Sequence, residues 1–145
     1  EYAADDIKAD PSIVLEAIKT NARALQYAAD DLRADPTVVF EAVKKDGCAL
    51  RYVSIDLRAD PTIVLEAIKA GNSSALHYAA DDLKEDQTIV LEAVERDGHA
   101  LQYAASDRIV DPTNVRMAIK TWGLALKHAA DDLRASPSIV FEAVK

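Results

Sequence analysis

The sequence lacks the features that mark secreted, membrane-embedded or disulfide-bonded proteins. Cys48 is the only cysteine among its 145 residues, so no internal disulfide can form. No apolar run approaches the roughly 18 residues that a membrane-spanning helix needs, so we expect no insertion into a bilayer. No basic and then apolar leader is visible at the start, which favours an intracellular protein of unknown compartment.

Motifs that carry chemistry are equally scarce. The sequence contains no Cys-x-x-Cys, His-x-x-His, phosphate-loop or Gly-x-Gly-x-x-Gly pattern, so metal and nucleotide sites lack their usual signatures. The 25 acidic and 17 basic residues give a formal net charge of -8, which disfavours nucleic acid as a ligand. We therefore expect no enzyme, no cofactor, no metal site and no nucleic-acid partner. A small-molecule or metal-dependent enzyme is the least favoured interpretation.

What the sequence does contain is an internal repeat. An aromatic residue returns every 25 residues, and once after 26, at Tyr2, Tyr27, Tyr52, Tyr78, Tyr103 and His128. A second position follows the same spacing, at Pro11, Pro36, Pro61, Gln87, Pro112 and Pro137. The spacing predicts six copies of a 25-residue unit, with one inserted residue near Gly71. The expected units are about residues 1–20, 21–45, 46–70, 71–96, 97–121 and 122–145, all in one domain.

Each unit predicts a pair of short helices. For the second helix, Asp35 is a typical N-cap and Pro36 suits the first helical position, before the apolar segment V-V-F-E-A-V-K. The same cap is expected at Asp10, Asp60, Asp86, Asp111 and Ser136. Gly47 and Gly98 are expected just past the end of this helix, where a left-handed glycine is common.

The first helix of a unit is predicted from an apolar stripe. Leu25, Ala28, Ala29 and Leu32 have the i, i+3, i+4, i+7 spacing of one helical face. The period-2 alternation that would predict a strand is absent from the sequence. Helices this short are marginal alone in water, so neighbouring units must supply their stability. We therefore predict an all-α protein, a right-handed α-solenoid of six helix-turn-helix repeats.

The repeated residues resemble a known family. A typical unit reads D-G-x-A-L-x-Y-A-x-x-x-L-[KR]-x-D-x-x-[IV]-V-x-x-A-[IV]-K, and residues 47–69 and 98–120 show it well. This pattern resembles a helical-pair repeat family catalogued only as a domain of unknown function, over essentially the whole chain. The resemblance implies a helical repeat fold and carries no activity, cofactor or catalytic residue.

Two residue types recur once per unit and invite functional interpretations. An acidic row is expected along one edge at Asp6, Asp31, Asp56, Asp82, Asp107 and Asp132. It is interpreted as a solvated or backbone-capping row, with a calcium site or a basic partner as the alternative. The tyrosines of the repeat are interpreted as packing residues, with base or ligand stacking as the alternative.

The fifth unit departs most from its siblings. The usual apolar-basic and Leu-Glu pairs are reversed, Asn114 stands where Ile or Val is usual, and the only Trp occupies a turn position that is Asn or Asp elsewhere. The candidate partner-binding residues are Arg108, Ile109, Arg116, Met117 and Trp122. With unchanged helices, Ile109 and Met117 would face solvent and both arginines the interior. Either the helices rotate and the unit is repacked without a function of its own, or the unit contacts a partner, because Arg, Met and Trp are enriched at interfaces.

These observations favour a non-enzymatic protein-protein interaction scaffold on an acidic helical-repeat array. The alternative is a structural linker subunit of a larger multiprotein assembly. Terminal units of such arrays expose apolar faces unless capped, and Tyr2, Ala3, Ala4 and Val144 offer little capping. We therefore also expect a longer array or end-to-end self-association.

Overall fold

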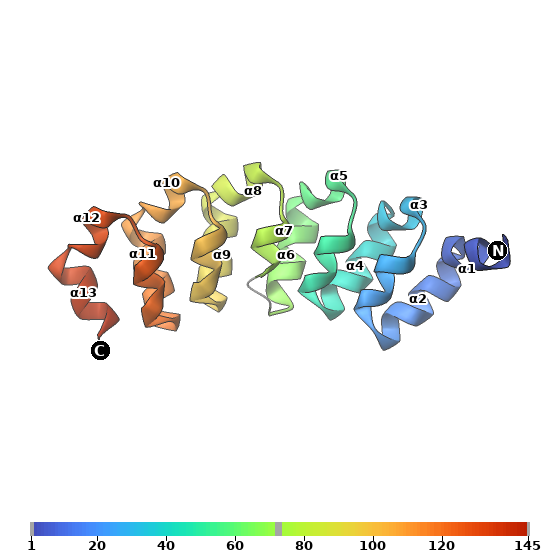
Figure 1. Cartoon of the computed structure of the whole chain (residues 1–145), viewed down its shortest axis with the longest axis horizontal. Coiled ribbons are helices and arrows are strands. Elements are labelled where there is room, and N and C mark those ends of the chain that lie inside the picture. Colours follow the sequence, from blue (N-terminus) through green and yellow to red (C-terminus); the bar gives the residue numbers. More distant parts are fainter. Residues whose placement is uncertain (1, 72–73, 145) are drawn as a thin grey trace.

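The computed structural model is an elongated row of short helices with its two termini at opposite ends (Figure 1). It describes the backbone of residues 2–71 and 74–144 and the side chains of residues 5–71 and 74–144. The described residues contain helices and turns but no strand, which confirms the all-α prediction. None of the helices in these ranges is long and apolar enough to cross a membrane.

The same series of elements returns along the chain. After α1 (Tyr2–Ala9), the longer helices are α2 (Pro11–Thr20), α4 (Pro36–Lys45), α6 (Pro61–Lys69), α9 (Gln87–Arg96), α11 (Pro112–Thr121) and α13 (Pro137–Ala143). Between them lie η1 (Ala22–Tyr27), η2 (Gly47–Tyr52), η3 (Gly98–Tyr103) and η4 (Gly123–His128), which are 3-10 helices, and α7 (Ser74–Tyr78). Short helices follow at α3 (Asp30–Arg33), α5 (Ile55–Arg58), α8 (Asp81–Glu85), α10 (Ser106–Ile109) and α12 (Asp131–Arg134).

These elements form two layers and an edge. The longer helices pack against one another in chain order, from α2 through α4, α6, α9 and α11 to α13. We call these six helices the long-helix layer. The elements η1, η2, α7, η3 and η4 pack against one another in the same order and form the short-helix layer. The helices α3, α5, α8, α10 and α12 lie along one edge of the row (Figure 1).

The starts of the long helices follow the predicted capping. The side chains of Asp10, Asp35, Asp60, Asp86 and Asp111 accept hydrogen bonds from the first backbone N–H groups of their helices. Asp35 Oδ1, for example, accepts from Thr37 N at 2.8 Å and from Val38 N at 3.1 Å. Ser136 is the exception, because its side chain makes no capping bond to α13.

Gly47 and Gly98 lie just past the ends of α4 and α9, as predicted, but neither has the left-handed conformation. Helix α4 ends at Lys45 with Asp46 as its C-cap, and Asp46 also caps the next element by accepting from Cys48 N at 2.9 Å. Gly47 instead starts η2 against α6, where an added Cβ would lie 2.1 Å from Ala67 O. Close approach of two backbones therefore requires the glycine. Only Gly71, at φ 90, has the left-handed conformation among the described residues.

The predicted first helix is wrong in shape but right in burial. It is split into η1 and the single turn α3, because Ala28 and Ala29 are extended, with ψ 153 and 159. The apolar stripe still reaches the core, since Leu25, Ala28 and Leu32 are buried and Ala29 is half-buried. In a 3-10 helix, residues i and i+3 lie on the same side, so η1 can turn its apolar residues toward the core as an α-helix would.

The core runs continuously along the row because each inner long helix buries the same four positions. These are Val38, Val39, Ala42 and Val43 in α4, then Ile63, Val64, Ala67 and Ile68 in α6, Ile89, Val90, Ala93 and Val94 in α9, and Asn114, Val115, Ala118 and Ile119 in α11. Neighbouring units are also joined through their backbones. Ala29 N donates to Lys8 O at 2.9 Å, and the same bond recurs from Ser54 to Arg33, Ala80 to Arg58 and Ala105 to Lys84.

Candidate functional site

The reversed residue pairs of the fifth unit do not rotate α11, so rotation, one of the two alternatives, is wrong for this helix. Helix α11 buries the same four positions as α9, which fixes its orientation. The exchanged positions lie at the boundary of the core, where Leu91 and Glu92 of the preceding unit are both half-buried. Met117 therefore stays half-buried against the core, and Arg116 is exposed. Arg116 is held loosely on α13, with Nε 3.9 Å from Glu142 Oε2.

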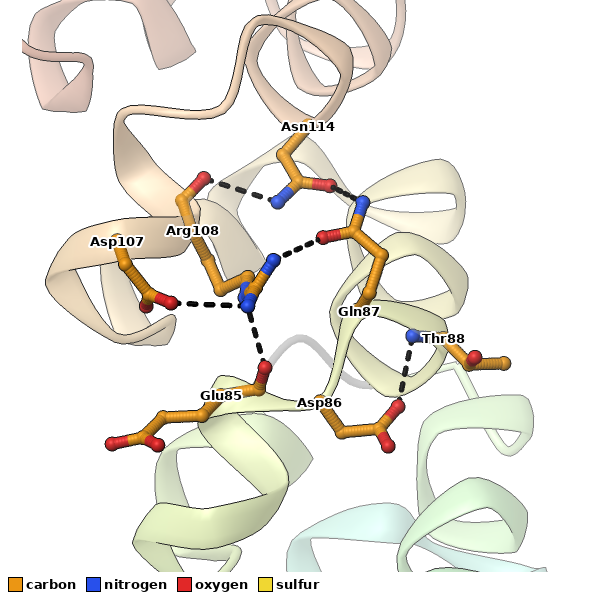
Figure 2. A network of polar contacts seen from close by, with 7 residues as sticks. All are labelled: Glu85, Asp86, Gln87, Thr88, Asp107, Arg108 and Asn114. Atoms are coloured by element: carbon orange, nitrogen blue, oxygen red, sulfur yellow. Dashed lines mark hydrogen bonds and ion pairs between the residues drawn. The ribbon is translucent and has the colours of Figure 1, made fainter.

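Arg108 and Ile109 likewise occupy boundary positions at the end of α10. Ile109 is half-buried and packs against the core, as Leu83 does in the preceding unit. Arg108 turns back toward α8 and α9 and is half-buried (Figure 2). Its Nε donates to Glu85 O and its Nη1 donates to Gln87 Oε1, both at 2.8 Å. A third contact, of 3.0 Å, joins Nη2 to the Asp107 carboxylate.

The same network reaches into the core through Asn114. Asn114 Nδ2 donates to Arg108 O at 3.0 Å, and Asn114 Oδ1 accepts from Gln87 Nε2 at 2.9 Å (Figure 2). Asn114 is 0% exposed, the one buried polar side chain among the described residues. Both ends of each amide are thus engaged, which removes the penalty for burying an unsatisfied polar group.

The network joins three departures from the repeat, at Gln87, Arg108 and Asn114. Gln87 stands where other units have Pro, and Asn114 where they have Ile or Val. Gln87 belongs to α9, whereas Arg108 and Asn114 belong to the following unit. The signal available in the sequence was that these departures fall in adjacent units. Arg108 therefore stabilises the junction between the fourth and fifth units.

Trp122 lies at the other end of α11 from Arg108. Its ring stacks on His99, with centroids 3.5 Å apart and planes at 15°, and Lys127 Nζ lies 5.0 Å from its centroid. The ring of His128 is 5.8 Å away. The five candidate residues therefore do not meet in one patch. The structure separates Arg108 and Ile109, at the end of α10 just before α11, from Trp122 at the far end of α11, with Arg116 and Met117 between them.

His128 replaces the tyrosine of the repeat and has an unusual environment. Its Nε2 atom is buried and has no hydrogen-bond partner within the described chain. Burial lowers the pKa of His128 below its ordinary value of 6.5, and the neighbouring Lys127 and His99 lower it further. The neutral imidazole is thus the form that the fold favours.

The acidic row is exposed, as expected, at Asp6, Asp31, Asp56, Asp82, Asp107 and Asp132. Three aspartates that directly precede members of this row form ion pairs within their own helices. Asp81 Oδ1 lies 2.9 Å from Lys84 Nζ, and the same pair forms between Asp30 and Arg33 and between Asp131 and Arg134. Over the part of the chain that the structure describes, no group of three or more His, Cys, Asp or Glu residues could hold a metal ion.

The tyrosine row contributes to packing between units. Tyr52, Tyr78 and Tyr103 are half-buried against the core, whereas Tyr27 is 68% exposed and the Tyr2 side chain lies outside the described residues. The Arg51 guanidinium lies 5.1 Å from the centroid of Tyr52 and 5.9 Å from that of Tyr78, in the next unit. Packing is therefore confirmed for the three inner tyrosines and not for Tyr27.

A groove between α2 and α4 was not anticipated from the sequence. It has a volume of about 490 Å³ and is lined by Leu15, Ile18, Lys19, Glu41, Lys44 and Lys45. Each helix supplies three residues with i, i+3, i+4 spacing, so one face of each helix forms one wall. The sequence gives the spacing but not the depth, which depends on how far apart the two helices pack.

Comparison with known proteins identifies the repeat. The model of a family described as Domain of unknown function (DUF4116) matches residues 1–33, 35–73 and 70–107. The chain belongs to this family. The resemblance inferred from the repeated residues is thereby confirmed, as tandem repeats of a DUF4116 type. No curated protein and no solved structure matches the chain.

Proposed function

We propose that this DUF4116 chain is a non-enzymatic protein-protein interaction scaffold, built as a right-handed α-solenoid of six 25-residue units. One observation carries the proposal. Every inner long helix buries the same four positions, which form two adjacent pairs. The two residues between these pairs therefore recur from helix to helix and form a regular outer face along the long-helix layer. Extended faces of this kind are the binding surfaces of stacked helical repeats.

The outer face of the long-helix layer alternates apolar and charged side chains. Its half-buried apolar residues are Leu15, Phe40, Leu65 and Leu91, each followed by a glutamate. The fifth unit breaks this order with exposed Arg116 and half-buried Met117, so it offers a partner a distinctive point on a repetitive surface. We assign the main partner contacts to Arg116, Met117 and Trp122, while Arg108 and Ile109 support them from the junction between units.

Restoring the repeat pattern tests this assignment without disturbing the fold. The variant Arg116→Leu/Met117→Glu gives the fifth unit the Leu-Glu pair that the fourth unit carries at Leu91 and Glu92. The unmodified chain and this variant are each used to capture partners from the native extract. Mass spectrometry then compares the amount of each partner that the two chains recover. Exposed Gln102 of η3 provides the control variant Gln102→Glu.

The proposal predicts that the pattern-restoring variant recovers roughly tenfold less of at least one partner, which is the effect expected from losing a small hot spot. Gln102→Glu should recover the same amount of that partner as the unmodified chain. Equal recovery by all three chains would remove the fifth unit from the interface. Circular dichroism on each variant checks that its helix content is unaltered.

A structural linker within a larger assembly is the second candidate, supported by the two ends of the row. Val144 is 75% exposed, whereas its repeat equivalents are at most 4% exposed, at Ile18, Val43, Ile68, Val94 and Ile119. At the other end Ile13 is 46% exposed, whereas its equivalents Val38, Ile63, Ile89 and Ile139 are also at most 4% exposed. These exposed apolar residues occupy positions that are buried between units in the interior of the row. Two such ends can cover each other, which favours end-to-end association.

Light scattering coupled to size exclusion tests the linker. End-to-end association predicts a mass that rises above the 15.7 kDa of one chain as concentration increases. Ile13→Glu should abolish the rise, because it places a charge on the apolar end face, whereas the neighbouring exposed Ser12→Glu should preserve it. A single-chain mass at every concentration would contradict the linker.

A further inference from the structure

The groove between α2 and α4 has two walls of different chemistry. The α2 wall presents the half-buried apolar side chain of Leu15, with Ile18 buried beneath it and Lys19 at its end. The α4 wall presents Glu41, Lys44 and Lys45. Three ammonium groups thus border one groove in a chain whose formal net charge is -8. A ligand that matches both walls must carry an apolar side and an acidic side.

The charges on the α4 wall are available to a ligand. Lys19 is engaged by Glu16, at 3.0 Å, on its own helix. Neither Lys44 nor Lys45 makes an ion pair with any residue that the structure describes, and both are exposed. Glu41, one turn earlier on α4, is the one negative group of the lining. The positive end of this wall is therefore its C-terminal turn.

The same place in the other units does not combine these features. The position of Lys45 is occupied by Thr20, Ala70 and Thr121 in three units, and by Arg96 in the fourth. Arg96 is paired, with Nε 2.7 Å from Glu92 Oε1. The pair of adjacent unpaired lysines beside an apolar wall is thus particular to the first two units.

We infer that this groove binds an amphipathic acidic helix of a partner protein. The inference rests on the proposed scaffold function and names a partner class for a second point on the same long-helix face. The helix lays its apolar stripe on Leu15, above the buried Ile18, and its acidic stripe along Lys44 and Lys45, the helix-in-groove mode of peptide recognition. The lining residues span i to i+4 on each helix, about 6 Å along its axis, so the groove itself contacts about one turn of the ligand helix.

A direct binding measurement tests the inference. The probe is a fluorescein-labelled peptide with two repeats of Leu-Glu-Glu-Leu-Leu-Glu-Glu, which places Leu on one helical face and Glu beside it. One comparison peptide has Lys in place of Glu, and another has the same composition in an order without a helical stripe. Fluorescence anisotropy is measured with the complete chain at low and at physiological salt.

Charge-reversal variants locate the site. Lys44→Glu/Lys45→Glu removes the positive wall, and Lys69→Glu/Lys120→Glu makes the same change of net charge at exposed positions in two other units. The first variant should weaken binding at least tenfold and the second less than threefold, and added salt should weaken binding to the unmodified chain. Leu15→Glu, on the apolar wall, should weaken binding as well.

Several results would overturn the inference. These are no binding of the acidic peptide, equal binding of the peptide without a stripe, or equal losses with the two double variants. The capture experiment on Arg116 and Met117 is independent of this groove. Partner capture that depends on the fifth unit together with failure of the peptide would reject the groove alone, whereas loss of both would reject the scaffold.

Discussion

At the scale of single residues, the departures from the repeat are more informative than the repeat itself. Gln87, Arg108 and Asn114 are each unusual for their positions, and the structure joins all three by hydrogen bonds. Sequence reasoning could identify Arg108 and Asn114 as exceptions. It placed Arg108 toward the interior if the helices kept their orientation, but it could not show that Glu85 and Gln87 of the preceding unit accept its hydrogen bonds.

The coupling of this network can be measured. Asn114→Ile leaves the Gln87 amide without its partner, and Gln87→Pro leaves the buried Asn114 amide unsatisfied, so each should lower the free energy of unfolding by about 1–3 kcal/mol. The double variant restores the residues of the other units and should lose clearly less than the sum of the two. Urea unfolding of the four chains gives the coupling energy, and additivity within about 0.5 kcal/mol would show that the residues are independent.

His128 predicts a specific pH dependence of stability. Its pKa is lowered in the folded chain, mainly by burial, so between that pKa and the ordinary value of 6.5 the unfolded chain binds more protons. Stability from this residue is therefore complete above pH 6.5 and is lost as the pH falls below it. His128→Tyr, which restores the residue of the repeat, should lose less stability than the unmodified chain between pH 7.5 and 5.5. Equal losses in urea unfolding at the two pH values would exclude this role for His128.

At the scale of elements, the long helices were predictable and the short ones were not. The Asp-Pro start is a local signal that needs no neighbour, and five of the six expected caps form. The choice between a 3-10 and an α-helix at residues 22–33 depends on packing against the next unit, which the apolar spacing does not contain. The close contact of Gly47 could not be predicted for the same reason, since its neighbour Ala67 is 20 residues away in the sequence.

The glycines at the starts of η2 and η4 give a matched test of close packing. An added Cβ would lie 2.1 Å from Ala67 O at Gly47, but 3.0 Å from Ala143 O at Gly123. Gly47→Ala should therefore lower the free energy of unfolding by about 2–4 kcal/mol, and Gly123→Ala by less than about 1 kcal/mol. Urea unfolding measures both. Similar values for the two variants would mean that Gly47 is kept for its flexibility and not for the contact.

At the scale of the whole molecule, the row of units follows from helices that cannot bury their apolar residues alone. The repeat period was visible in the sequence, and the family match confirms tandem repeats over residues 1–107. The sequence predicted the exposed row of aspartates but not the groove of α2 and α4, because the groove depends on how far apart the two helices pack. The groove of α2 and α4 and the exposed row of aspartates are both products of this arrangement.

The proposed solenoid requires the units to be stacked in a line, and small-angle X-ray scattering of the single chain tests this directly. A compact domain of 145 residues has a radius of gyration of about 15 Å. Six units at helix-packing distances of about 8–10 Å predict a larger value, with an asymmetric distance distribution extending beyond about 50 Å. A radius near about 15 Å with a symmetric distribution would show a bundle closed around one centre and would contradict the stacked array.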